Sequence, residues 1–219
     1  MDDSLVSLLA HQAVLHDCRD CPDMTGPPVT GQAVMSPVML IGQAPGPREI
    51  ETGRPFAWTS GRTLFGWFAG LGLTEQEFRS RVYMSAVCRC FPGKNPKGGD
   101  RVPSRHEVGC CGHWLQGDLD LLAPRLVIPV GRLAIARFFD ARRLVDVIGS
   151  QGHWETARGR CVDVIPLPHP SGVSSWFKTE PGRTLLARAL GLIGAHPVWQ
   201  DVVQGQARGM PKSHHSPPA

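Results

Sequence analysis

The sequence predicts an α/β fold with three layers, α/β/α, around a central four-stranded, mostly parallel sheet. Short apolar runs alternate along the chain with segments whose apolar residues recur at helical spacing. Strands that alternate with helices are typical of parallel sheets covered on both faces. With 219 residues, of which 42% are hydrophobic, the chain is long enough for one well-packed domain. We expect that domain over residues 1–200, followed by a disordered tail at 201–219 that is rich in Pro, Ser and His.

Four apolar runs are the expected strands. They contain β-branched residues, and continuous apolar runs of this kind are typical of strands that are buried on both faces of a parallel sheet. The expected strands are residues 38–41, 82–87, 126–130 and 162–167.

The expected helices are the segments with apolar residues at helical spacing. Two of them begin with a capping box, formed by Thr74 with Glu77 and by Ser104 with Glu107. Pro45 and Pro47 argue against regular structure directly after the first strand. The expected helices are 4–15, 63–73, the segment from 74 onward, 104–122, 131–139 and 182–193.

Composition limits where the protein acts. No apolar stretch approaches the ~20 residues that span a bilayer, and the first residues lack the pattern of an export signal. We therefore expect a cytoplasmic protein without membrane contact, and a monomer, since no oligomerisation signal stands out. A formal net charge of +4 permits a polyanionic partner without requiring one.

Two loops carry the first functional signal. Gly42 to Gly46 reads GQAPG and follows the first apolar run, and Pro168 to Gly172 reads PHPSG and follows the last. Loops at the carboxyl ends of parallel strands line the ligand crevice of such sheets, so the two loops are expected to converge. Their glycines and prolines bring backbone close to a ligand, and His169 can donate a hydrogen bond. The combination indicates chemistry on a ligand with a sugar-phosphate backbone.

The seven cysteines carry the second signal. Cys18 and Cys21 have the two-residue gap that lets two thiolates reach one metal centre. Four more cysteines flank the loop before the helix expected at 104–122, so four thiolates can be assembled. Zinc and an iron–sulfur cluster both accept four cysteines, and buried structural thiols are a third interpretation. The spacing leaves these three open.

Several short motifs follow one another in a fixed order between residues 18 and 192. They are Cys-x-x-Cys-Pro, Gly-x-Ala-Pro-Gly, Gly-x-Pro-Phe, Ser-Gly-Arg, Cys-x-Pro, Cys-Gly-His-Trp-Leu and His-Pro-Ser. This ordered set closely resembles the uracil-DNA glycosylase superfamily, and in particular its iron–sulfur branch, the fourth family. The resemblance implies an α/β/α fold, a flipped-out base in the crevice and a [4Fe-4S] cluster.

The resemblance also implies the cluster ligands, position by position. They are Cys18, Cys21, Cys90 and Cys111, which leaves Cys88, Cys110 and Cys161 as non-ligands. The segment between Cys90 and Cys111 is longer than is usual in the family, and residues 97–100 are the apparent insertion.

In the family, the histidine that corresponds to His169 donates toward uracil O2 as negative charge grows there. Gln43 and the amide of Ala44 would lie beside the base and the attacking water, and Glu49 is the candidate for organising that water. Phe56 matches the aromatic that stacks on uracil. The implied catalytic residues are His169, Gln43 and Glu49, and the implied base-binding residues are Gly42, Ala44, Phe56 and Ala86.

A further set of residues would contact the DNA, because the family's corresponding loops approach the backbone and the base stack. These are Arg54, Ser60, Arg62, Ser171, Gly172, Ser174 and Trp176.

Two positions depart from the fourth family's pattern. Gln43 stands where that family carries a glutamate, and an amide can orient water but cannot accept its proton. Ala86 stands where the family's asparagine reads the edge of uracil. These changes bear on substrate range and rate rather than on the fold.

The resulting hypothesis is an enzyme that flips uracil, and other deaminated bases as further candidates, out of single- or double-stranded DNA. It would hydrolyse the N-glycosidic bond, release uracil and leave an abasic site for base excision repair. The alternative is a non-catalytic protein of the same fold that binds abasic sites or damaged DNA.

Overall fold

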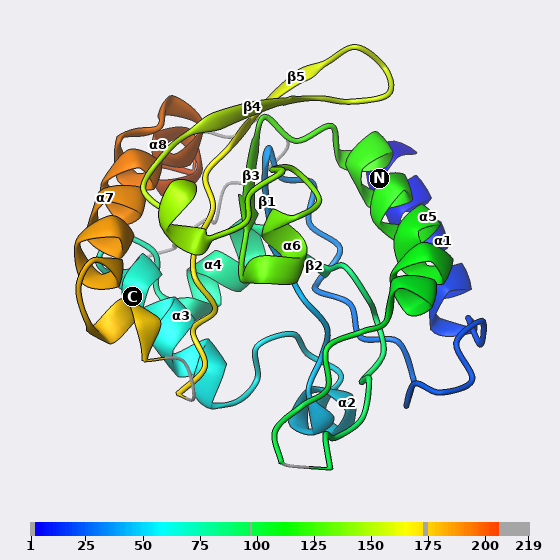
Figure 1. The fold of residues 1–219 in the computed structure, drawn as a ribbon. Helices are drawn as coiled ribbons and strands as arrows, with labels where there is room; N and C mark the ends of the chain where they lie inside the picture. The colour runs from blue at the N-terminus through cyan, green and yellow to red at the C-terminus, as the bar shows by residue number, and fades with distance from the viewer. Residues whose placement is uncertain (1–2, 97, 173–174, 206–219) are drawn as a thin grey trace, which may run out of the picture.

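The computed structural model describes residues 3–96, 98–172 and 175–205. Its centre is a five-stranded sheet in the order β2-β1-β3-β5-β4, in which only the β4–β5 pair is antiparallel (Figure 1). The strands are β1 (Val38–Gly42), β2 (Tyr83–Ala86), β3 (Leu126–Pro129), β4 (Gly152–Glu155) and β5 (Cys161–Val164).

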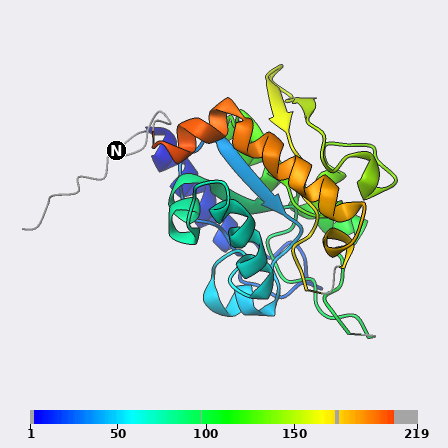
Figure 2. The same cartoon turned by 90° about the vertical axis from the view of Figure 1, so that its left-hand side faces the viewer.

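Helices cover both faces of the sheet. Helices α1 and α5 pack together on one face, and α3, α4, α7 and α8 cover the other, as the two views show (Figures 1 and 2). None of the helices in the described segments is long and apolar enough to cross a membrane. The α-helices are α1 (Asp3–His16), α2 (Pro47–Thr52), α3 (Thr59–Ala69), α4 (Glu75–Arg81), α5 (Arg105–Leu122), α6 (Arg132–Ile135), α7 (Gly182–Ala195) and α8 (Pro197–Val203), and the 3₁₀ helices are η1 (Leu144–Asp146) and η2 (Trp176–Lys178).

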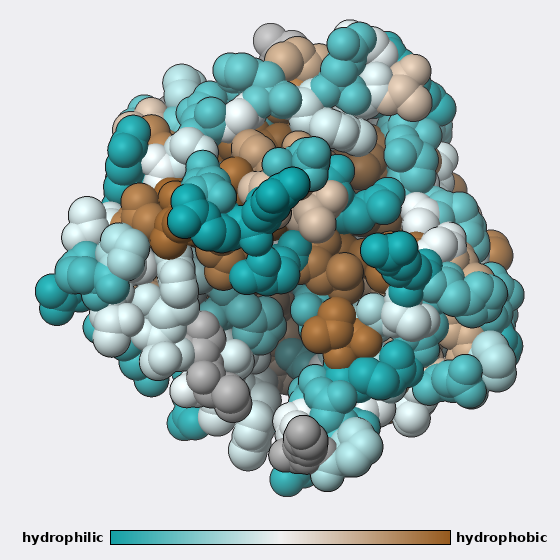
Figure 3. All heavy atoms as spheres, in the orientation of Figure 1, coloured by the Kyte–Doolittle hydropathy of each residue, from teal (hydrophilic) through white to brown (hydrophobic). Residues whose placement is uncertain are grey.

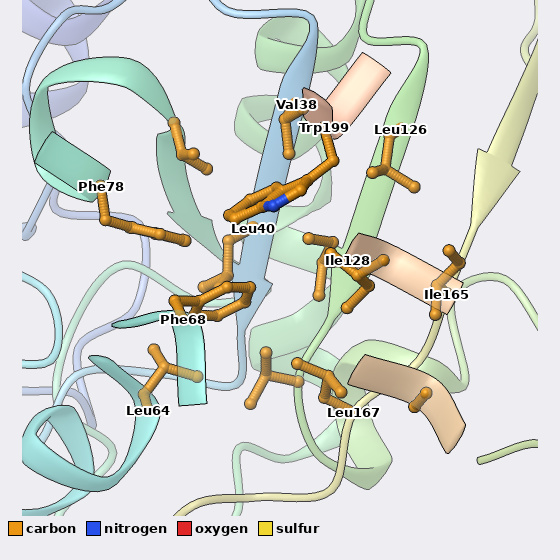
Figure 4. Packing of buried hydrophobic residues seen from close by; sticks show 14 of the residues in the cluster. Val38, Leu40, Leu64, Phe68, Phe78, Leu126, Ile128, Ile165, Leu167 and Trp199 are labelled. Carbon is orange, nitrogen blue, oxygen red and sulfur yellow. The ribbon is translucent and has the colours of Figure 1, made fainter. Parts of the chain in front are cut away.

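The alternation of side chains along the strands divides the core in two. In β1, Val38 and Leu40 face α3, α4, α7 and α8, while Met39 and Ile41 face α1 and α5. On the first face, Trp199 lies fully buried against Phe68, with ring centroids 5.2 Å apart (Figure 4). Burial on both faces explains why the strands are continuous apolar runs.

The α/β class and the mostly parallel sheet are confirmed, but the count of four strands was wrong. The fifth strand, β4, is an antiparallel edge strand whose residues alternate between partial and full exposure, so it has no apolar run to reveal it. The extent of the single domain stays a prediction. The disordered tail was expected from residue 201, but α8 continues to Val203, and residues 206–219 lie outside the described residues.

Two predictions about helical structure directly after the strands were also wrong. Pro47 begins α2 instead of preventing it, because the first helical position needs no N–H donor. The helix expected over 131–139 ends as an α-helix at Ile135. Both capping boxes are present as predicted, at Thr74 and at Ser104.

A buried ion pair lies between the sheet and its α1–α5 face. Asp118 of α5 is fully buried and pairs with Arg89, which is 1% exposed. Tyr83 and Ser85 of β2 also donate to the Asp118 carboxylate, at 2.9 and 2.8 Å. Burial alone would raise the pKa of Asp118, but the Arg89 charge and hydrogen bonds from His11, Arg89 and Ser85 hold it below its ordinary value. The carboxylate is therefore ionised and joins α5 to β2.

Removing this carboxylate should destabilise the fold strongly. We expect Asp118→Ala to lower the free energy of unfolding by about 3–5 kcal/mol, because Arg89 is left as an unpaired buried charge. Denaturant unfolding measures the change. Asp146→Ala, which removes the exposed partner of Arg143, is the control and should change stability little. Equal losses in the two variants would contradict the assignment.

Candidate active site and cysteine pocket

The end of β1 lies directly beneath an aromatic ring. Gly42, the last residue of β1, pairs in register with Ala86 of β2. A Cβ atom at Gly42 would lie only 3.3 Å from two ring carbons of Phe56, so the ring covers the glycine directly. Three of the residues implied for base binding therefore lie together at one strand end.

The loop after β1 is held by backbone contacts on both sides. The N–H of Cys88 donates to the carbonyl of Gln43 at 3.0 Å. Glu49 is the third residue of α2, and its carboxylate accepts a hydrogen bond from the N–H of Gly46, with the N–H groups of Phe56 and Ala57 near enough to favour its charged form. Glu49 thus ties the first loop to the segment that carries Phe56. Burial raises the pKa of Glu49 above its ordinary value.

His169 lies beyond the end of β5 and packs on Gly131. Gly131 has φ +85°, and a Cβ atom there would lie 3.1 Å from Cδ2 of His169, so this approach requires glycine. The backbone N–H of Ser171 donates to Nδ1 of His169 at 3.2 Å. Burial lowers the pKa of His169 below its ordinary value. The ring is therefore neutral at pH 7, and its proton lies on Nε2, where it can be donated.

The two loops converge as expected. The N–H of Val130 donates to Ile41 at 2.8 Å, and the N–H of Gly131 donates to Leu167 at 2.9 Å, so β3 continues between them. Neighbouring strands lie about 4.8 Å apart. Gly42 and Gly131, against which Phe56 and His169 pack, therefore lie beyond the ends of neighbouring strands.

Asp100 adds a carboxylate that the sequence did not single out. It comes from the loop between β2 and α5, which lies beside α2 at the lower edge of Figure 1. Its Oδ2 atom lies 3.3 Å from where a Cβ of Gly46 would be, and its Oδ1 atom pairs with Lys94 at 2.6 Å. Its charge raises the pKa of Glu49 and opposes the effect of burial on His169. The apparent insertion at 97–100 thus contributes to the site.

The residues expected to contact DNA differ in how exposed they are. Arg54 and Arg62 are exposed near the start of α3, and Gly172 is exposed after His169. Ser60 and Ser171 are half-buried, and Ser174 lies outside the described residues. Trp176 is partly buried and packs against the core. The space-filling view shows mainly hydrophilic side chains on this face, with a hollow toward the end where the parallel strands terminate (Figure 3).

The four cysteines implied as ligands line a single pocket of about 230 Å³. It lies between the segment after α1, the segment after β2 and the first turns of α5, and Cys110 and Arg89 line it as well. Burial and the neighbouring thiols raise the pKa of Cys21 to about 12. Within the described ranges, no three Cys, His, Asp or Glu side chains already converge as metal ligands.

Arg89 connects this pocket to Ala86 at the end of β2, which pairs with Gly42 of β1. Its Nε donates to the carbonyl of Ala86 at 3.0 Å and one terminal nitrogen pairs with Asp118, while the other, Nη1, is buried without a hydrogen-bond partner. A bound anionic group would satisfy that donor, and a cationic metal centre would stabilise the crowded thiols as thiolates. The donor set therefore fits a thiolate-ligated cluster.

The fold and these loops define an α/β protein with a ligand site at the carboxyl ends of its parallel strands. The family model for the uracil DNA glycosylase superfamily matches residues 28–190. That range covers most of the chain, so the chain belongs to the uracil-DNA glycosylase superfamily, and the resemblance seen in the sequence is confirmed.

Curated relatives agree with this assignment. A type-4 uracil-DNA glycosylase of Pyrobaculum aerophilum is 30% identical over 169 residues, which cover 73% of this chain and 81% of the relative. A type-4 uracil-DNA glycosylase of Thermotoga maritima is 29% identical over 136 residues, which cover 61% of this chain and 64% of the relative. A type-5 uracil-DNA glycosylase of Pyrobaculum aerophilum is 30% identical over 149 residues, 61% of each chain.

The state of His169 can be measured directly. NMR titration should give His169 a pKa below the ordinary value of about 6.5 and a neutral form protonated at Nε2. Asp100→Asn should lower that pKa further, since the carboxylate favours the charged ring. Asp146→Asn, at an exposed pair on η1, should leave it unchanged. A pKa at or above 6.5 would contradict burial as the controlling effect.

Proposed function

We propose that this chain is a uracil-DNA glycosylase that flips uracil out of DNA and hydrolyses its N-glycosidic bond. The observation that carries the proposal is the neutral His169, whose Nδ1 accepts from Ser171 and whose proton is thus left on Nε2, at the end of the sheet where Phe56 covers Gly42. Membership of the superfamily supplies the substrate class, and the type-4 relatives supply the name of the activity.

Cleavage needs stabilisation of opposite charges on the two fragments. As the bond between C1′ and N1 breaks, its electron pair passes to uracil and leaves an oxocarbenium-like sugar. The Nε2–H of His169 donates to uracil O2, where negative charge grows, and a donor placed before the reaction is worth more there than in water. Water then attacks C1′ to form the sugar hydroxyl, and the proton it loses neutralises the departing uracil anion by way of solvent. Glu49 and Asp100 supply negative potential that favours the cationic sugar.

Base binding at this strand end would proceed without a side chain at position 86 that reads the edge of uracil. Phe56 offers a ring for stacking, worth roughly 1–3 kcal/mol per base, and Gly42 lets that ring lie directly against the end of β1, next to Ala86 of β2. Because Ala86 has no donor or acceptor in its side chain, recognition of the base falls to backbone groups and to Gln43. We include hypoxanthine as a candidate substrate for this reason.

We assign a [4Fe-4S] cluster to the cysteine pocket, with Cys18, Cys21, Cys90 and Cys111 as ligands. When bound, the cluster would form one bond to each of the four cysteine thiolates and would thereby join three separate segments of the chain. Arg89 would donate from Nη1 toward the cluster and its thiolates. Its hydrogen bond to the Ala86 carbonyl links the pocket to the end of β2, beside the expected base site. Cys110 lines the same pocket and is the candidate replacement ligand.

Excision can be tested with end-labelled single-stranded oligonucleotides that hold one uracil, hypoxanthine or xanthine, cleaved by alkali after incubation. We expect uracil-dependent cleavage, and a rate about 10²–10³-fold lower in His169→Ala, as for loss of one donor to a developing anion. His153→Ala, at a 65% exposed histidine, is the control. No cleavage of any substrate, with tight binding to abasic DNA, would support the non-catalytic alternative instead.

The cofactor has its own test. Protein purified without oxygen should be brown and should contain iron and acid-labile sulfide in equal amounts. Cys111→Ala should lose both, since it removes a buried ligand, whereas Cys161→Ala, at an exposed cysteine on β5, should keep them. Colourless protein that contains zinc would exclude the cluster.

A further inference from the structure

Phe56 has an unusual backbone conformation. Its φ is +52°, and among the described non-glycine residues only Ala123 also has a positive φ. Side chains with a Cβ disfavour this region, and a large aromatic residue adopts it only where its surroundings impose it. The conformation places the ring over Gly42. Something in the fold must therefore hold Phe56 in place.

Arg79 of α4 contacts this backbone directly. Its Nη1 donates to the carbonyl of Pro55 at 2.9 Å, and its Nη2 donates to the carbonyl of Phe56 at 3.2 Å. The planar guanidinium thus spans two consecutive carbonyls, as a lysine could not.

Arg79 is itself held rigidly. Its side chain is only 12% exposed, and its Nε pairs with Glu75 at 2.9 Å. Its guanidinium also lies 4.6 Å from the ring centre of Phe65. These contacts fix the position of the donors before any ligand binds.

Gly61 lets α3 approach the same point. A Cβ atom there would lie 1.8 Å from the carbonyl oxygen of Phe56, so no other residue fits. On the opposite side, the N–H of Phe56 lies near enough to the Glu49 carboxylate to lower its pKa. The carbonyl of Phe56 is held by Arg79, the one charged donor among the partners described here.

We propose that Arg79 is a positioning residue for base recognition, which holds the ring of Phe56 over Gly42 as a preformed stacking surface. The inference rests on the proposed function, because it assigns uracil as the group that stacks. Arg79 acts through Phe56 and does not itself touch the base. Its loss should weaken capture of the flipped base while leaving His169 and its hydrogen bond in place.

Arg81 provides a matched control on the same helix. It pairs with Glu77 at 3.3 Å, four residues away, and donates to the carbonyl of Val203 at 2.8 Å. Arg79 and Arg81 thus make the same kinds of contact, but Arg81 holds the end of α8. Each alanine variant should lose some thermal stability, and only one should affect the base site.

The experiment is a double-mutant cycle of Arg79→Ala and Phe56→Ala, with Arg81→Ala as control, measured as kcat/KM on a uracil-containing single strand. We expect Phe56→Ala to lower kcat/KM about 10–100-fold, the value that corresponds to lost base stacking. Arg79→Ala should lower it by about tenfold and should add little in the Phe56→Ala background. Arg81→Ala should leave it within about twofold at a temperature where all variants are folded.

Equal effects of Arg79→Ala and Arg81→Ala, or full additivity with Phe56→Ala, would overturn the proposal while leaving the glycosylase activity standing. A readout that does not depend on activity completes the test. In a crystal structure of Arg79→Ala, Phe56 should leave positive φ and its ring should leave Gly42. An unchanged Phe56 overturns the positioning role even if the wild-type protein excises nothing.

Discussion

The buried pair of Asp118 and Arg89 is the interaction on which both candidate sites depend. Arg89 lies three residues after the end of β2 and between the two sites, with its Nε donating to the Ala86 carbonyl and its charge paired with Asp118 of α5. A fully buried arginine is tolerated only where its charge is matched, and the carboxylate, kept ionised, provides that match. The pair fixes the end of β2, and Cys90 follows immediately. The same ion pair therefore stabilises both the end of β2 beside the expected base site and the cysteine pocket.

The sheet separates packing from chemistry. Its two faces are covered by apolar side chains of the helices. The polar groups of the candidate active site lie beyond the carboxyl ends of β1, β3 and β5. Glycine makes this arrangement possible at Gly42 and Gly131, where the rings of Phe56 and His169 lie against the backbone. The two aromatic groups can approach a flat base from different strands because neither strand carries a side chain at the contact.

Much of the fold and part of the site could be predicted from the sequence. The buried parallel strands are apolar runs and the capping boxes are local patterns, so both are visible without tertiary structure. The edge strand β4 has no such pattern, because its exposure on one side removes the need for an apolar run. The roles of Arg79 and Asp100 depend on contacts between residues distant in sequence, which no local pattern encodes. The assigned roles of the site residues stay predictions.

The departures at Gln43 and Ala86 are consistent with a site that relies on fixed geometry more than on acid–base side chains. Glu49 uses its carboxylate to accept the backbone N–H of Gly46, and His169 is held neutral by burial and by Ser171. A bond that breaks before water attacks needs a donor for the departing base and a stacked, flipped nucleotide more than it needs a strong base. An amide at position 43 can still orient the water. Catalysis at such a site depends on where Phe56 and His169 are held, and the backbone contacts around the two residues fix their positions.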